Sequence, residues 1–126
     1  MSNNFKTNPK EDLAKVLSDI ESSQEMNSFL TDLCTPAELR ALSERWHVAK
    51  ILDSNEKSYR QINSETGVST TTIARVARFL RDEPHQGYRT VLNRLERIKN
   101  NTMLFFRCFV FLSILYHLRD VLLFGS

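Results

Sequence analysis

The chain has 126 residues, 41% of them hydrophobic, which allows one domain with a single modest core. Its net charge is +2, and its two isolated cysteines and three scattered histidines argue against a disulfide framework or a metal site; no cofactor is expected. Only three glycines and three prolines interrupt it, and no stretch alternates polar with apolar residues, so we expect an all-α fold of about six helices. The polar N-terminus carries no secretory signal, which favours a reduced, cytoplasmic setting.

Two short helices are predicted at the start of the chain. Residues 1–7 are expected to form a disordered arm, and a first helix to run from an Asn8 cap to about Ser22. Ser22 and Glu25 have the spacing of a capping box for a second helix. Each helix carries one narrow apolar stripe, formed by Leu13, Val16, Leu17 and Ile20 and by Met26, Phe29, Leu30 and Leu33. We interpret both stripes as core that packs on another surface, such as a second copy of the chain.

A longer third helix is predicted after Thr35. Proline at the first helical position and Glu38 at the third follow this cap, and the helix should continue to about Leu52. Its apolar face is wide, which makes it the best candidate for a central core helix. Arg45 lies on this helix, and composition alone indicates a surface residue. A polar turn, residues 53–56, then ends the pattern.

The stretch from Ser58 to Arg81 predicts a helix-turn-helix. Ser58 and Gln61 have capping-box spacing, Gly67 supplies the positive φ that ends the first helix, and Ser69 caps the second. Val68 supplies an apolar plug for the turn. A buried stripe is predicted on the second helix, at Ile73, Val76, Ala77 and Leu80. The opposite face carries Thr70, Thr71, Ala74, Arg75 and Arg78, which suits a helix that enters a DNA major groove by its N-terminus.

The charge distribution favours the same interpretation. Residues 1–56 hold 6 basic and 10 acidic side chains, whereas residues 57–126 hold 11 and 5. Within the helix-turn-helix, four arginines face a single Glu65, a local excess that phosphates attract. Solvated surface arginines remain the alternative explanation.

The last part of the chain divides into a sixth helix and an atypical tail. The helix should follow Gly87, with an apolar stripe through Ile98. Residues 101–126 are apolar nearly all round, yet their longest uncharged block, Cys108–Tyr116, is far short of the ~20 residues that a membrane span needs. We therefore expect this tail to extend the sixth helix and to pack across a dimer, with a sticky or disordered tail as the alternative and a membrane span disfavoured.

From Phe29 to Leu95 the chain resembles the tryptophan-repressor superfamily, most closely its YerC/YecD subgroup. Three segments carry the resemblance in order, namely FLTDLCTPAELRALSERWHVAKIL, SYRQINSETGVSTTTIARVARFL and the GY before the last helix. It implies that residues 8–100 form a DNA-binding and dimerisation domain, in which terminal helices of two chains interlock and expose two helix-turn-helix units. The DNA contacts that it implies fall on Arg60, Asn63, Val68, Thr70, Thr71 and Ala74, and we add Ser69, Arg75 and Arg78 to this candidate interface.

The resemblance also implies a candidate site for a small-molecule effector. Tryptophan-binding members use two arginines that match Arg45 and Arg75 of this chain. Val76 and Phe79, however, stand where those members carry glycine and serine, so their bulk should fill the space of the indole ring. We expect an effector other than tryptophan, if any.

Motifs for catalysis are missing from the sequence. It contains no phosphate-cradling glycine-rich loop, no GxSxG elbow and no Cys/His or paired-carboxylate arrangement, so an enzyme is not expected. The favoured function is a dimeric transcription regulator, with repression as its expected mode, that reads a pseudo-palindromic operator in double-stranded DNA. The alternative is an interaction module, either a helical bundle that binds protein or a domain resembling the promoter-reading part of a sigma factor.

Overall fold

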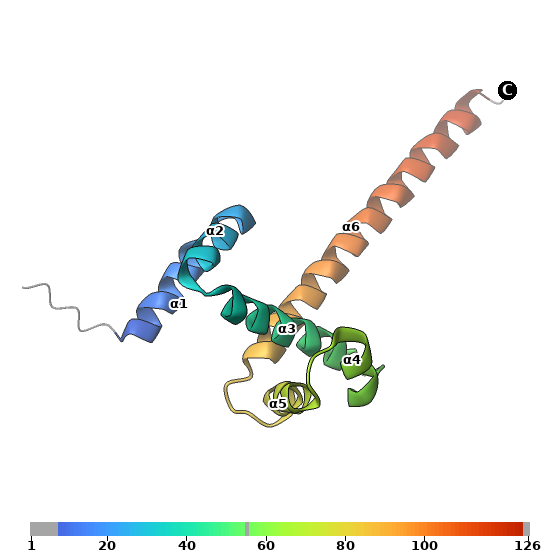
Figure 1. Cartoon of the computed structure of the whole chain (residues 1–126). Coiled ribbons are helices and arrows are strands. Elements are labelled where there is room, and N and C mark those ends of the chain that lie inside the picture. The colour runs from blue at the N-terminus through green and yellow to red at the C-terminus, as the bar shows by residue number, and fades with distance from the viewer. Residues whose placement is uncertain (1–7, 55, 125–126) are drawn as a thin grey trace, which may run out of the picture. The chain divides into compact units, whose positions relative to one another are not determined.

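The computed structural model describes the backbone of residues 8–54 and 56–124, with side chains as far as Ile114 (Figure 1). The predicted arm at residues 1–7, Asn55 of the predicted turn and residues 125–126 lie outside the described residues. The described part is helical and contains no strand, which confirms the all-α prediction. It holds six helices: α1 (Pro9–Asp19), α2 (Ser23–Leu33), α3 (Pro36–Asp53), α4 (Tyr59–Thr66), α5 (Thr70–Arg81) and α6 (Gly87–Phe124). Two compact units divide the chain, residues 1–46 and residues 47–126, and the boundary falls within α3.

Helices α1 and α2 of the first unit begin at the predicted caps. The Asn8 side chain accepts a hydrogen bond from the Lys10 amide at 3.1 Å, and the Ser22 hydroxyl accepts one from the Glu25 amide at 3.1 Å. Helix α1 ends at Asp19, three residues before the predicted end, and Ile20 is extended. Ser22 must itself be extended to cap α2, so only Ile20 and Glu21 remain to link the two helices.

The apolar stripes of α1 and α2 are less buried than predicted. Neither helix has a buried residue, and Leu13, Val16 and Leu33 are exposed. Within α3, Leu42 is also exposed, and the buried residues are Val48 and Ala49 in its last turns. The single chain therefore leaves the stripes of α1 and α2 without a buried residue, and their predicted packing on another surface, such as a second copy of the chain, stays a prediction.

A reciprocal cap begins α3. The Thr35 hydroxyl accepts from the Glu38 amide at 3.3 Å, and Glu38 Oε2 accepts from both the amide and the hydroxyl of Thr35 at 2.8 Å. These bonds, first that from the Thr35 amide, lower the pKa of the Glu38 carboxyl below its usual value of 4.5.

The lowered pKa predicts a pH-dependent contribution to stability. A carboxyl whose pKa falls on folding stabilises the native state above its unfolded pKa, and this contribution is lost as the pH falls through the folded value. The free energy of unfolding, measured with denaturant, should therefore fall more between pH 6 and pH 3 for the wild-type chain than for Glu38→Gln. Equal losses in both proteins would contradict the role of this carboxylate.

The second unit contains the core. Helix α5 packs on both α4 and α6. The buried hydrophobic residues all belong to this unit: Val48, Ala49, Ile62, Val68, Ile73, Val76, Ala77, Leu80 and Leu92. The stripe predicted on α5 is confirmed in full, and it faces this core.

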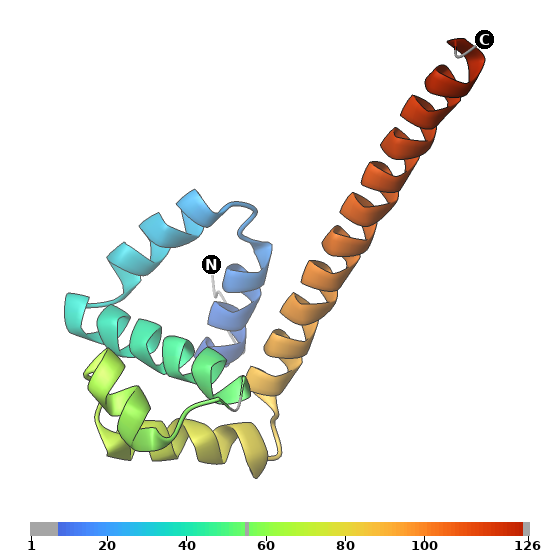
Figure 2. The same cartoon turned by 90° about the vertical axis from the view of Figure 1, so that its right-hand side faces the viewer.

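Helix α6 is a continuous helix of 38 residues (Figure 2). It contains no proline and no glycine after its first residue, so nothing in the sequence interrupts it. The prediction that the apolar tail extends the sixth helix is confirmed for the backbone as far as Phe124. Over the described residues, no helix has both the length and the hydropathy that a membrane crossing requires.

Candidate nucleic-acid interface

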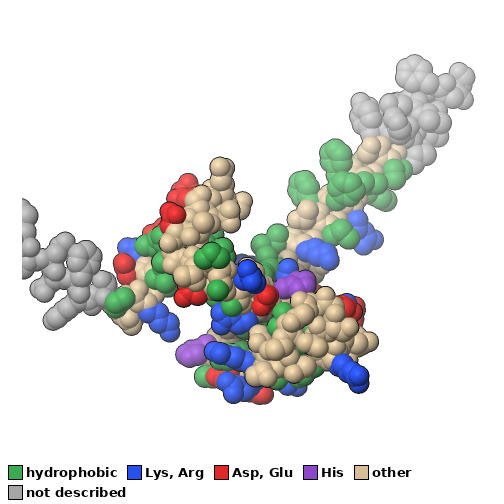
Figure 3. All heavy atoms as spheres, viewed as in Figure 1, with side chains coloured by type: hydrophobic (Ala, Val, Ile, Leu, Met, Phe, Trp, Pro, Cys, Tyr) green, Lys and Arg blue, Asp and Glu red, His purple; other side chains and the backbone are tan. Residues whose placement is uncertain are grey.

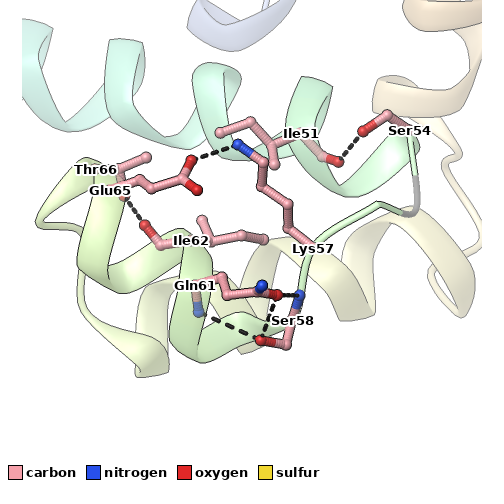
Figure 4. Close-up of polar contacts among 8 residues, drawn as sticks. All are labelled: Ile51, Ser54, Lys57, Ser58, Gln61, Ile62, Glu65 and Thr66. Carbon is pink, nitrogen blue, oxygen red and sulfur yellow. Dashed lines mark hydrogen bonds and ion pairs between the residues drawn. The ribbon is translucent and has the colours of Figure 1, made fainter.

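The two helices of the predicted helix-turn-helix are α4 and α5, and local hydrogen bonds cap the start of each helix. Ser58 Oγ accepts from the Gln61 amide at 3.3 Å while Gln61 Oε1 accepts from the Ser58 amide at 2.8 Å, so the predicted capping box is present (Figure 4). Gly67 has a φ of +72°, a conformation that side chains with a Cβ rarely adopt. Ser69 Oγ then caps α5 by accepting from the Thr72 amide at 3.2 Å.

Two polar side chains also hold the turn. Asn63 Nδ2 donates to the Val68 carbonyl at 2.9 Å, and the Val68 amide donates to Thr66 Oγ1 at 3.2 Å. The amide group of Asn63 is therefore directed at the turn, which sequence reasoning missed. Val68 itself is buried and plugs the turn as predicted, so its side chain is not available for the DNA contact that the resemblance implied. We assign both residues a structural role.

Replacing Asn63 by alanine should destabilise the second unit by about 1 kcal/mol, because the Val68 carbonyl loses its donor. The matched control is Ser64→Ala, which changes an exposed neighbour on the same helix and brings a similar gain in helix propensity. Urea unfolding measures both changes. A control that loses as much stability as Asn63→Ala would show that this hydrogen bond contributes nothing.

The remaining candidates lie on the exposed side of the motif. Thr70, Thr71, Ala74 and Arg75 of α5 are exposed, as is Arg60 on α4. The hydroxyls of Thr70 and Thr71 make no hydrogen bond within the described part of the chain, whereas the Ser69 hydroxyl is engaged with Thr72. Helix α5 thus presents small polar side chains at its N-terminus and its buried stripe on the other side.

The arginines near this exposed face differ in whether a carboxylate is paired with them. Among the described residues, neither Arg60 nor Arg75 is paired with a carboxylate, while Arg78 Nε lies 3.4 Å from Glu83 Oε1. The guanidinium groups of Arg75 and Arg78 lie 5.7 and 5.4 Å from the centre of the Phe79 ring, within the range of a cation–π interaction. Figure 3 shows basic side chains along the lower edge of this unit. Arg60 and Arg75 are therefore free to meet phosphate.

Three side-chain contacts lie around the motif in the second unit, and two of them join segments far apart in the sequence. Arg81 Nη2 donates to the Tyr59 hydroxyl at 3.2 Å and joins the end of α5 to the start of α4. Arg89 of α6 pairs with Asp53 at the end of α3, and Lys57 pairs with Glu65 (Figure 4). These contacts join α4 to α5 and α3 to α6 within the second unit.

The structure assigns the two effector candidates to different units. Arg45 belongs to the first unit, where it is half-buried and its Nε donates to the Ala41 carbonyl at 3.0 Å. Arg75 belongs to the second unit. Val76 is buried in the core of that unit.

Comparison with known proteins decides the family. Residues 10–96 match the family model described as Trp repressor protein. The chain belongs to the Trp repressor family. Its relatives include the uncharacterised protein YerC of Bacillus subtilis (strain 168), which is 34% identical over 83 residues that cover 66% of this chain and 78% of YerC.

Solved structures of Trp repressor-like proteins share the fold. A TrpR-like protein from Eubacterium eligens ATCC 27750 is 37% identical, with a TM-score of 0.65 over 75% of this chain and 96% of that structure. A candidate Trp repressor from Staphylococcus aureus is 34% identical, with a TM-score of 0.64 over 70% of this chain and 86% of the other. The Trp repressor family consists of DNA-binding regulators and not of enzymes, which agrees with the helix-turn-helix. The match to YerC confirms the predicted subgroup.

Proposed function

We propose that this Trp repressor family member is a sequence-specific transcription regulator that binds a pseudo-palindromic operator as a homodimer. The observation that carries the proposal is the division of α5 into two faces. Ile73, Val76, Ala77 and Leu80 are buried, whereas Thr70, Thr71, Ala74 and Arg75 are exposed. A helix fixed by one face to a core and presenting small polar groups on the other is suited to the major groove.

The exposed residues divide into two roles. Thr70 and Thr71 have hydroxyls that can donate to or accept from base edges and methyl groups that can contact the thymine methyl. Arg60 is suited to a phosphate, because it lies on α4 outside the reading helix and no carboxylate competes for it among the described residues. Arg75 can add a phosphate contact, and Arg78 can do so if it leaves Glu83.

A second copy of the chain would account for the exposed apolar stripes of the first unit. Neither α1 nor α2 buries a residue in the single chain, and short helices are marginal without a partner surface. Pairing two chains by a twofold axis would also present two copies of α5, which should meet half-sites about 34–36 Å apart. A dimer bound to promoter DNA would block transcription, so repression is the simplest mode of regulation. The protein would act in the bacterial cytoplasm, at the nucleoid.

We propose that any small-molecule effector of this regulator is not tryptophan, with Arg45 and Arg75 each kept as a candidate contact within its own unit. Val76 already occupies core space, and the Phe79 ring is in cation–π contact with Arg75 and Arg78, so an indole ring would displace packed side chains. Overpacking of this kind typically costs about 1–3 kcal/mol.

Calorimetric titration with L-tryptophan should therefore give no more heat than titration with glycine, which has the same charged groups without the indole. Ligand at millimolar concentration makes the titration sensitive to weak binding as well. Micromolar affinity for L-tryptophan would contradict this prediction.

A binding titration on random-sequence duplex DNA tests the proposed function against an interaction module. Fluorescence anisotropy should show non-specific binding with a dissociation constant of roughly 10⁻⁴–10⁻⁶ M near physiological salt, weakening steeply as salt rises. A module that binds only protein would leave the anisotropy unchanged even at low salt, and that result would overturn the proposal.

A further inference from the structure

Helix α6 carries an exposed apolar stripe, here called the seam, along most of its described side chains. Its large residues are between 44% and 78% exposed: Val91, Leu95, Ile98, Phe105, Phe109 and Leu112. Figure 3 shows hydrophobic side chains gathered along this helix. The seam extends past residue 96, where the match to the Trp repressor family model ends. Family membership therefore does not account for its C-terminal half.

The spacing of the seam is that of paired helices. With Thr102 included, successive members are alternately four and three residues apart, which is the seven-residue repeat of a left-handed coiled coil. The hydroxyl of Thr102 donates to the Ile98 carbonyl at 2.9 Å, so this residue brings no unsatisfied donor into the seam. Leu92, which is buried in the core of the second unit, lies outside the repeat.

The seam is apolar both in the first part of α6, up to Asn101, and in the part that follows. Between Val91 and Asn101 the positions outside the seam, apart from the buried Leu92, carry charged or polar side chains, among them Arg94, Arg97 and Lys99. Apolar residues on the opposite side, such as Leu104 and Phe111, begin only at Met103. A surface that remains apolar where its neighbours are charged is typical of a helix paired in water.

The exposed area of the seam matches what a stable pair needs. If a phenylalanine offers about 200 Å² and an aliphatic side chain slightly less, the exposed fractions give on the order of 700 Å² per chain. Stable protein interfaces bury about 800 Å² on each partner. A lipid bilayer is a poorer occupant, because no described helix meets the length and hydropathy of a span and a bilayer requires no seven-residue repeat.

We propose that α6 pairs along the seam with α6 of a second copy of this chain. The pair extends the interface of the proposed dimer beyond the part of the chain that the family model covers. It would place Phe105, Phe109 and Leu112 against the same residues or their neighbours in the other copy and remove them from water.

Two phenylalanines with nearly equal exposure allow a matched test. Phe109 lies on the seam and is 69% exposed, whereas Phe111 lies away from it and is 65% exposed. Sedimentation equilibrium of the full chain should show that Phe109→Lys raises the dissociation constant of the homo-oligomer at least tenfold, because it places two lysines in the seam. Phe111→Lys should change it less than twofold. Circular dichroism checks that both variants retain their helices.

Two results would overturn the inference. Equal effects of the two substitutions, or no effect of either, would show that the repeat is not a specific interface. If the wild-type chain sediments with phosphatidylcholine and phosphatidylglycerol vesicles, and both substitutions reduce this binding equally, lipid is the occupant of the seam. Either result leaves the proposed DNA-binding function intact, because that function is tested separately by anisotropy.

Discussion

Replacing Ile73 by alanine is expected to lower the free energy of unfolding by about 2–5 kcal/mol. Ile73 is 0% exposed and lies on the buried stripe of α5, which packs on α4 and α6. Truncation removes its share of buried apolar surface and leaves a cavity that neighbouring side chains fill only in part. Since domains of this size have about 5–15 kcal/mol of stability, the loss should be visible directly in urea unfolding.

Thr71→Ala is the control for this measurement. It changes an exposed residue on the same helix and should alter stability by no more than about 0.5 kcal/mol. Both variants need to be compared at one protein concentration, because the proposed dimer would make the apparent stability depend on concentration. A loss below 1 kcal/mol for Ile73→Ala would mean that the stripe is not the core of the second unit.

The Arg60→Ala variant should bind every duplex sequence more weakly, by about five- to tenfold near 0.1 M salt. A phosphate contact contributes no sequence information, so the loss should not depend on the base sequence. It should also reduce the slope of log affinity against log salt by about 0.9, the value for one released counterion. Anisotropy titrations over a range of salt concentrations give both quantities.

Arg60→Lys separates charge from shape in the same experiment. Lysine keeps the charge but not the planar guanidinium, so the salt slope should be retained while some affinity is lost. If Arg60→Ala keeps the wild-type slope, Arg60 does not contact phosphate, and its exposure in the structure has another explanation.

Local signals predicted most of the secondary structure. The caps at Asn8, Ser22, Ser58 and Ser69 and the turn at Gly67 each depend on residues within three positions of one another, so the sequence displays them directly. The buried stripe of α5 was also predicted correctly, because apolar residues three and four positions apart lie on one face of a helix.

Contacts between distant residues could not be read in this way. Asp53 and Arg89 are 36 positions apart and Tyr59 and Arg81 are 22 apart, and no local pattern pairs them. Gln86 has a φ of +50° just before α6, where sequence rules would place glycine. The stripes of α1 and α2 were read correctly as apolar faces, but apolar spacing does not reveal whether the same chain or another copy covers them.

Selection of bound sites from random duplex DNA, performed in parallel with the wild-type chain and Thr71→Ala, tests the central claim most directly. Thr71 is exposed at the start of α5, so removal of its hydroxyl and methyl groups should leave the fold and the proposed phosphate contacts of the arginines in place. The wild-type chain should enrich an inverted repeat. Thr71→Ala should change the preferred base at one position of each half-site, with a discrimination of about 1–3 kcal/mol lost there. Recovery of no common sequence, or of the same sequence by both proteins, would contradict the assignment of α5 as the reading helix.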